Sequence, residues 1–167
     1  MSDYHPHGSR ASGFGFLRAL LWLWGKLPFP NIVRWWIVYT FKRKFLIGVV
    51  AVVWNDKDEV LLFRHTYRPR WPWGLPSGLL EQGENPARAI EREITEETGL
   101  TVRALAPVLV LHEKQVAQVD LVYRGRLEGG TFRPSAEVSE ARFFPRDALP
   151  KLPLEQLKIL AETPPPG

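Results

Sequence analysis

Cysteine is absent from the 167-residue sequence. Its absence excludes disulfide bonds, thiolate metal sites and cysteine nucleophiles, and it suits a cytoplasmic protein without proving that location. The sequence also has no internal repeat and no apolar run of the roughly 20 residues that a membrane-spanning helix requires. Because no small-residue cleavage site follows the early apolar stretches, a signal peptide is disfavoured along with a transmembrane anchor. The length suits one domain with a sizeable core.

The charge balance is basic, with a formal net charge of +4 and a pI near 9.6. A positive balance favours contact with phosphates or anionic surfaces. A charge of this size is nevertheless common in proteins that bind neither, so it is weak evidence for a partner.

The first 45 residues divide into a polar tail and an apolar extension. Residues 1–13 are polar and are predicted to be disordered. Residues 14–45 carry four tryptophans among aliphatic residues and a basic run at 42–44. This composition suits an interfacial helix, but it also suits a homodimer contact or a cover over the core. We favour protein packing, and a peripheral association with an anionic membrane surface stays open.

A short helix is predicted at residues 86–98. Asn85 is a good N-cap, Pro86 fits the first turn, and Gly99 can adopt the left-handed conformation that ends a helix. On a 3.6-residue wheel, Ala87, Ile90 and Ile94 form one apolar stripe.

Three glutamates stand together along the edge of that stripe, at Glu93, Glu96 and Glu97. They oppose the negative end of the helix dipole, and like charges four residues apart cost about a few tenths of a kcal/mol per pair. An all-carboxylate cluster suits a hard cation, so Mg²⁺ or Mn²⁺ is favoured over zinc. Taken alone, however, three glutamates more often form a solvated acidic face.

The residues around the glutamates change that balance. The chain has glycine, glutamate and arginine at every fixed position of the pattern Gly-x5-Glu-x7-Arg-Glu-U-x-Glu-Glu-x-Gly-U, in which U is apolar. The matching residues are Gly78, Glu84, Arg92, Glu93, Ile94, Glu96, Glu97, Gly99 and Leu100. The chain therefore resembles a Nudix hydrolase of the MutT-like family, which uses divalent metal to cleave a nucleoside diphosphate linked to another group X.

This resemblance implies roles for the residues of the pattern. Glu93, Glu96 and Glu97 would be metal ligands or lie next to them. Arg92 and Glu84 would orient the helix and loop as an ion pair, with Gly78 and Gly99 among the supporting residues.

One departure from the family precedes the pattern. The family commonly has a second glycine where this chain has Ser77, and a backbone carbonyl near that point often helps to bind metal. A serine that cannot adopt glycine dihedrals would put this ligand in doubt.

The chemistry needs a proton acceptor as well as a metal. A cation held by the glutamates would neutralise the diphosphate oxygens and lower the pKa of bound water. Glu97 or Glu93 could accept the proton, and Glu137 resembles the loop glutamate that the family often supplies after the motif. Asp120 lies inside a predicted strand and is interpreted as structural.

A stretch of arginines and aromatic residues follows the second predicted strand. Such residues beside a metal site could stack a base and neutralise phosphate, whereas the same residues could form a rigid proline–tryptophan loop packed on the core. Both interpretations stay open. The candidates for substrate binding are Arg64, Arg68, Arg70 and Trp73.

The periodicity predicts an α+β protein, and the resemblance implies a Nudix fold, an α/β/α sandwich with a mixed sheet. Residues 46–163 would form the Nudix hydrolase domain, and residues 164–167 a tail. Strands are predicted at 46–54, at 60–64 as its hairpin partner, and at 102–111, 116–123 and 141–144, with a turn at 127–132 and a helix at 153–161.

The substrate implied is a nucleotide-type diphosphate. The residues that are typical of family subgroups that cleave ADP-ribose or dinucleotides are missing near residues 114–116. A nucleoside triphosphate, a nucleotide sugar or alcohol, and a 5′-phosphorylated RNA end therefore stay open as substrates. The alternative is a non-catalytic Nudix-fold module that binds nucleotides or associates with membranes as a regulator. Catalysis is favoured because every carboxylate of the pattern is present.

Overall fold

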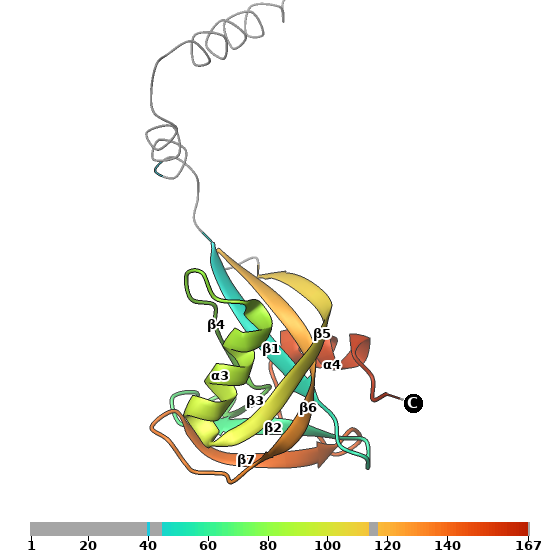
Figure 1. The fold of residues 1–167 in the computed structure, drawn as a ribbon. Coiled ribbons are helices and arrows are strands. Elements are labelled where there is room, and N and C mark those ends of the chain that lie inside the picture. The colour runs from blue at the N-terminus through green and yellow to red at the C-terminus, as the bar shows by residue number, and fades with distance from the viewer. Residues whose placement is uncertain (1–39, 41–44, 114–116, 167) are drawn as a thin grey trace, which may run out of the picture. The chain divides into compact units, whose positions relative to one another are not determined.

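The structure, a computed structural model, describes residues 40, 45–113 and 117–166 (Figure 1). The predicted tail at 1–13 lies outside the described residues, as does nearly all of the apolar extension at 14–45. Among the described residues, no helix combines the length and apolar character needed to cross a membrane.

Strand β1 (Leu46–Val53) lies inside a four-stranded sheet with the order β4-β1-β6-β5. Its neighbours are β4 (Ser77–Leu79), which is antiparallel to it, and β6 (Gln118–Gly130), which is parallel. The long strand β5 (Leu100–Glu113) pairs with β6 in antiparallel fashion. The sheet is therefore mixed, as predicted.

A second, antiparallel sheet has the order β3-β2-β7, with β2 (Glu59–His65) between β3 (Trp73–Gly74) and β7 (Val138–Pro145). The predicted hairpin between β1 and β2 is thus wrong in its pairing. The two strands share only the isolated bridge between Trp54 and Val60. Both edges of β1 are already occupied by β4 and β6, so β2 pairs elsewhere.

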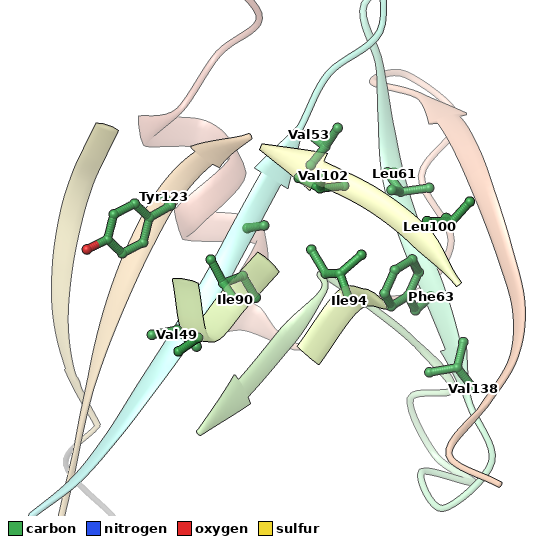
Figure 2. Close-up of a cluster of buried hydrophobic side chains, with 12 residues drawn as sticks. Val49, Val53, Leu61, Phe63, Ile90, Ile94, Leu100, Val102, Tyr123 and Val138 are labelled. Atoms are coloured by element: carbon green, nitrogen blue, oxygen red, sulfur yellow. The ribbon is translucent and has the colours of Figure 1, made fainter. Parts of the chain in front are cut away.

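Two hydrophobic cores lie on opposite faces of β1. Val49, Ala51 and Val53 pack with the helix α3 (Pro86–Thr98), on which Ile90 and Ile94 are fully buried (Figure 2). The alternate residues Val50 and Val52 pack with α4 (Leu154–Glu162) through Ile159 and Leu160. Because successive side chains of a strand point to opposite faces, one apolar strand supplies both cores. The predicted α/β/α arrangement is confirmed.

The predicted bounds of α3 are confirmed, together with its caps. The Asn85 side chain accepts a hydrogen bond from the Ala87 N–H at 3.0 Å, and Gly99 has a left-handed φ of 70°. The turn predicted at 127–132 is wrong because β6 continues to Gly130, which pairs with Leu100 of β5. A Cβ atom at Gly130 would lie 2.4 Å from the Gly99 carbonyl oxygen, so this close approach of two strands requires glycine.

Candidate active site

A pocket of about 670 Å³ opens beside α3 and the short strand β4. It extends from the α3 side of the four-stranded sheet to the α4 side. Six of the residues predicted for the site line it, namely Arg68, Ser77, Gly78, Glu93, Glu97 and Glu137. The structure therefore brings together, from four separate segments, most of the residues to which a metal or catalytic role was assigned.

Gly78 allows Glu93 to lie against β4. A Cβ atom added at Gly78 would lie 2.2 Å from Cγ of Glu93, which is far inside van der Waals contact. The backbone N–H of Leu79 donates to Oε1 of Glu93 at 3.4 Å. The glycine is thus required by the close approach of the carboxylate side chain.

Ser77 does not strain the backbone of β4. It pairs with Val50 in the antiparallel ladder, and the only described non-glycine residue with a positive φ is Asp58. The glycine dihedrals that a serine would find costly are therefore not needed at position 77. Ser77 lines the wall of the pocket.

Glu97 is a partly buried carboxylate on the wall of the pocket. Burial, followed by the negative charges of Glu137 and Glu93, raises its pKa to about 7, while Arg68 acts in the opposite direction. Carboxylates crowded in this way favour either a proton or a cation between them. The surroundings of Glu97 thus fit a positively charged ligand.

The side chains do not form a finished metal cage as they stand. Within the described ranges, no group of three or more His, Cys, Asp or Glu side chains is close enough to hold an ion. Glu93 is held by Leu79 and lies 3.3 Å from Nη1 of Arg92. Glu93, Glu97 and Glu137 nonetheless share one pocket, and their oxygens are the donors that a hard divalent cation prefers. The donor set therefore fits such an ion once the side chains rotate toward it.

Glu96 is placed differently from the other two glutamates of α3. Its side chain is 62% exposed, does not line the pocket, and accepts a hydrogen bond from Nη1 of Arg92 at 3.1 Å. The predicted role of Glu96 as a direct metal ligand therefore has no support in this arrangement, because Arg92 holds the carboxylate outside the pocket.

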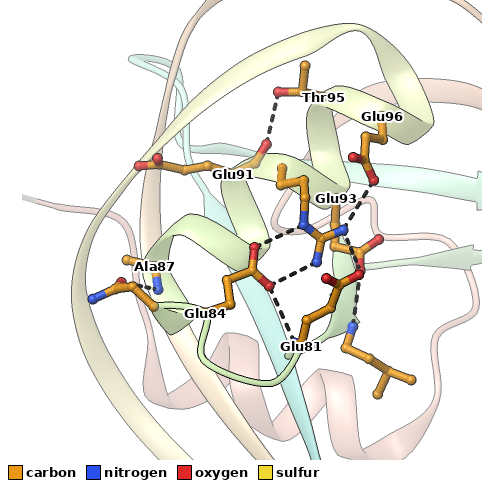
Figure 3. Close-up of polar contacts among 10 residues, drawn as sticks. Glu81, Glu84, Ala87, Glu91, Glu93, Thr95 and Glu96 are labelled. Carbon is orange, nitrogen blue, oxygen red and sulfur yellow. Dashed lines mark hydrogen bonds and ion pairs between the residues drawn. The ribbon is translucent and has the colours of Figure 1, made fainter.

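Arg92 ties the motif loop to α3. Its Nε and Nη2 donate to the two carboxylate oxygens of Glu84 at 2.9 and 3.0 Å, and Figure 3 shows Glu84, Glu93 and Glu96 gathered around the guanidinium group. The hydrogen bond from Arg92 lowers the pKa of Glu84, and Glu84 in turn raises the pKa of Arg92 above its usual range. Both groups thus stay charged, and the loop before α3 is fixed by a two-pronged ion pair.

Of the four predicted substrate residues, only Arg68 lines the pocket. Trp73 packs edge-on against Phe144 with ring centroids 4.7 Å apart, beside the core under α4. Arg64 is exposed on β2, and Arg70 lies over the ring of Trp71. Of the two interpretations of this stretch, packing against the core holds for Trp73, because its ring packs on Phe144 of β7.

Sequence reasoning missed several pocket residues. Tyr67, His112, Gln118, Asp120, Gln156 and Lys158 all line the pocket. Asp120 had been interpreted as structural, and the signal that could have identified it is a carboxylate in an apolar strand opposite a glycine. Gly48 of β1 pairs with Asp120 in the parallel ladder. Tyr67 lies in the arginine- and aromatic-rich stretch that was considered for base stacking, whereas nothing near Lys158 in the sequence indicates the pocket.

Beneath Tyr67 lies the buried ring of His65, with centroids 5.4 Å apart. Burial, followed by the positive charge of Arg68, lowers the pKa of His65 to about 4. The ring is therefore neutral near pH 7, and it supports the loop that carries Tyr67 and Arg68 without adding charge to the pocket.

The sequence of this chain is similar to those of several known proteins. The family model described as NUDIX domain matches residues 44–163. The 8-oxo-dGDP phosphatase NUDT18 of Homo sapiens is 37% identical over 117 residues, covering 67% of this chain and 36% of that protein. The ADP-ribose pyrophosphatase of Methanocaldococcus jannaschii is 31% identical over 127 residues, covering 72% of this chain and 75% of that protein.

Among solved structures, a MutT NUDIX hydrolase from Burkholderia pseudomallei superposes with a TM-score of 0.64 at 26% identity. The match covers 72% of this chain and 98% of that one. The chain spans only 38%, 36% and 35% of the length of the NUDT18 proteins from mouse, human and zebrafish.

We expect the substitution Arg92→Ala to lower both the melting temperature and the activity. Glu84 would lose the partner of both its oxygens, and supporting residues of this kind typically change metal affinity or activity by about 10- to 100-fold. Arg88→Ala is the matched control on the same helix, because Arg88 is 68% exposed and pairs only with Glu91 among the described residues. An unchanged melting temperature with altered substrate affinity alone would make Arg92 a phosphate contact instead.

We expect Gly78→Ala to reduce activity far more than Ser77→Gly. The added methyl group must push the Glu93 side chain away from β4, whereas removal of the Ser77 side chain leaves the strand backbone and its carbonyl in place. Steady-state rates and melting curves for both variants provide the measurement. Equal activity in the two variants would show that the position of Glu93 against β4 is unimportant.

Proposed function

The chain belongs to the NUDIX domain family, and we propose that it is a divalent-metal-dependent pyrophosphohydrolase acting on a nucleoside diphosphate linked to X. The observation that carries this proposal is that Glu93, Glu97 and Glu137 line the same pocket. Burial, followed by the neighbouring charges of Glu137 and Glu93, raises the pKa of Glu97, so a cation in the pocket would favour its charged form.

We assign the binding of Mg²⁺ or Mn²⁺ to Glu93, Glu97 and the Ser77 carbonyl, with Glu96 in reach only if Arg92 releases it. A bound cation of this kind would neutralise the oxygens of the diphosphate and lower the pKa of a water molecule beside it. The Arg92–Glu84 pair fixes the first turns of α3, so Glu93 and Glu97 face the pocket from one rigid helix.

Glu137 is the residue to which we assign proton removal from the attacking water. It enters the pocket from the segment before β7, opposite α3. Its side chain makes no ion pair among the described residues, whereas Glu93 is held by Leu79 and Arg92. Glu137 can therefore accept a proton while the glutamates of α3 hold the cation. Glu93 and Glu97 remain the other candidates for this role.

Arg68 is the residue to which we assign contact with the substrate phosphates. Among the described residues that line the pocket it is the only arginine, and its charge acts on Glu97. Tyr67 is 54% exposed at the pocket wall and offers an aromatic face to the substrate. An arginine beside an aromatic ring suits a nucleotide, whose phosphates and base need different partners.

The names of the relatives support our proposal of a nucleotide-type substrate. The matched proteins are called an 8-oxo-dGDP phosphatase and an ADP-ribose pyrophosphatase, and a solved structure similar in fold is called a UDP-X diphosphatase. All of these substrates are nucleotides that contain a diphosphate. A binding module without turnover is the weaker alternative, because this chain retains all the carboxylates of the motif. An RNA 5′ end belongs in the same substrate panel.

A homodimer contact is our proposal for residues 14–45. Phe45, the last residue of this segment, and Leu46 and Ile47 after it are between 39% and 57% exposed, so apolar side chains are exposed at the start of the described domain. Sedimentation of the full chain, with and without anionic vesicles, tests the proposal, and we expect a dimer in both conditions. A monomer that pellets only with vesicles would refute the dimer and support a membrane contact.

We expect Glu97→Gln to lower the rate of hydrolysis by several orders of magnitude, because the change removes both a charge and a ligand from a hard-ion site. Glu96→Gln should cost less, since Glu96 lies outside the pocket. Glu128→Gln makes the same chemical change at an exposed position outside the pocket, so it is the control for the loss of one carboxylate charge. The measurement is release of phosphate-containing products from a nucleotide panel with Mg²⁺, Mn²⁺ or excess chelator.

Stability provides an independent readout for the same variant. A carboxyl group whose folded-state pKa is raised to about 7 destabilises the fold as the pH rises through that value. Glu97→Gln removes this penalty, so without metal the variant should melt at the same temperature as the parent or higher at pH 8. Turnover comparable to the parent in Glu97→Gln, or full activity in chelator, would refute the assignment.

A further inference from the structure

We propose that His65 and Tyr67 are positioning residues that set the affinity of the pocket for the substrate phosphates. Their packed rings hold the guanidinium group of Arg68 in place without neutralising its charge. This inference rests on the proposed function, in which Arg68 contacts those phosphates. It assigns to both residues an effect on binding that acts through Arg68.

Arg68 is held by an aromatic ring and not by a carboxylate. Its guanidinium carbon lies 5.3 Å from the centroid of the Tyr67 ring, and its Nη2 donates to the Tyr67 hydroxyl at 3.4 Å. No ion pair of Arg68 occurs among the described residues, whereas Arg92 pairs with three glutamates. A ring face orients a guanidinium group and leaves its charge for an anion, which a paired carboxylate would not do.

Gly74 gives space to Arg68 beside Gln156 of α4. A Cβ atom at Gly74 would lie 3.3 Å from Nη1 of Arg68 and 3.2 Å from both the amide nitrogen and the amide oxygen of Gln156. The Gln156 oxygen accepts a hydrogen bond from the Leu75 N–H at 2.9 Å. Its amide nitrogen is a donor, as the guanidinium group is, so neither neutralises the other. The charge of Arg68 thus stays available to an anion in the pocket that both side chains line.

The His65 ring packs against the Tyr67 ring from the protein interior. Their centroids are 5.4 Å apart and their planes are tilted by 58°, which is within the range of favourable aromatic pairs. His65 is 3% exposed, whereas Tyr67 is 54% exposed, so part of the Tyr67 ring stays open to a ligand. The buried ring therefore limits the positions that the exposed ring can adopt.

The ring of His65, and not its nitrogen atoms, makes this contact. Neither Nδ1 nor Nε2 has a hydrogen-bond partner among the described residues. One of them carries a hydrogen when the ring is neutral, and a buried donor without a partner destabilises the fold. Burial, followed by the charge of Arg68, lowers the pKa of His65 to about 4, so near pH 7 the ring does not repel Arg68. The side chain therefore contributes an uncharged ring at this place and no hydrogen bond.

Backbone hydrogen bonds fix the two ends of the loop that carries Arg68. The His65 N–H donates to the Pro72 carbonyl at 2.7 Å, and the Thr66 N–H donates to the Glu137 carbonyl at 2.9 Å. The loop thus has a fixed base, and the two rings extend this order to the Arg68 side chain. Because the same base holds the backbone of Glu137, the phosphate contact and the proposed proton acceptor keep constant relative positions.

The first test compares Tyr67→Leu with Tyr67→Phe on a nucleotide that the parent hydrolyses with Mg²⁺ present. Leucine removes the ring face, so the substrate itself must order the Arg68 side chain. For Tyr67→Leu we expect KM to rise about 3- to 10-fold with kcat little changed. Tyr67→Phe keeps the ring and loses only the hydrogen bond of 3.4 Å, so it should behave like the parent. An unchanged KM in Tyr67→Leu would overturn the proposal.

A second pair of variants tests the buried ring. In His65→Phe a ring still packs on Tyr67 and no nitrogen atom lacks a partner, so we expect the KM of the parent and an equal or higher melting temperature. His65→Ala removes the support of Tyr67 and should raise KM by about the same factor as Tyr67→Leu. A purely structural role would lower the melting temperature of His65→Ala and leave the KM of the folded enzyme unchanged. A raised KM in His65→Phe would also overturn the role of the ring.

Coupling to Arg68 is measured by repeating Tyr67→Leu and His65→Ala in an Arg68→Ala background. Arg68→Ala alone should raise KM by about 10- to 100-fold, because it removes charge-assisted hydrogen bonds to phosphate. Once Arg68 is gone, the other two changes should have no further effect on KM, since residues that act through one another are not additive. Full additivity would overturn the proposal, because the rings would then act on the substrate without Arg68.

Failure of the proposed function can be told apart from failure of this inference. If the parent hydrolyses nucleotides and Arg68→Ala leaves KM unchanged, the inference fails and the hydrolase assignment stands. If the parent hydrolyses nothing, the hydrolase assignment fails, and calorimetry with inorganic pyrophosphate and Mg²⁺ then tests the rings alone. Weaker binding of pyrophosphate by Tyr67→Leu than by Tyr67→Phe would support the positioning role, and equal binding would overturn it.

Discussion

The site depends on Arg92, which neutralises part of the negative charge of α3 and of the loop before it. Arg92 binds both oxygens of Glu84 and also contacts Glu93 and Glu96. Glu97 has no such partner among the described residues, and its pKa is raised to about 7. The arginine therefore neutralises the outer side of the helix, whereas no ion pair among the described residues neutralises Glu97 on the pocket side. Without Arg92, the repulsion among these carboxylates would act on the helix and the loop together.

The position of β1 explains why a pocket forms beside these carboxylates. β1 is buried on both faces, so α3 and α4 each pack against it from opposite sides. Its neighbour β4 is only three residues long and has a free outer edge in the four-stranded sheet. Side chains from α3 and from α4 can therefore line one pocket beside this short edge strand. The pocket therefore includes glutamates of α3 and side chains of α4, although these elements cover different faces of the sheet.

Local signals in the sequence predicted α3 well, because its caps and its apolar stripe lie within a few residues of one another. Asn85 and Gly99 end the helix where the pattern predicted. The pairing of β2 was not predictable in this way, since it depends on which edges of β1 are free. Gly78 was identified from the motif, yet its physical reason, contact with Glu93 fifteen residues later, required the structure. Asp120 was missed because Gly48, which accommodates it, is more than seventy residues away.

Two glycines of the four-stranded sheet, Gly48 and Gly78, each make space for a carboxylate side chain. Gly48 and Gly78 both lie in extended strands, where any residue could adopt the backbone conformation. In each case the missing Cβ makes space for a carboxylate, Asp120 at one strand and Glu93 at the other. β1 and β4 pair so that these two glycines lie in adjacent positions of the ladder, Gly48 opposite Leu79 and Gly78 opposite Val49. Since neighbouring positions face opposite sides of a sheet, the two carboxylates point to different faces. The pocket that contains both Glu93 and Asp120 therefore reaches both faces of the sheet beside the short edge strand β4.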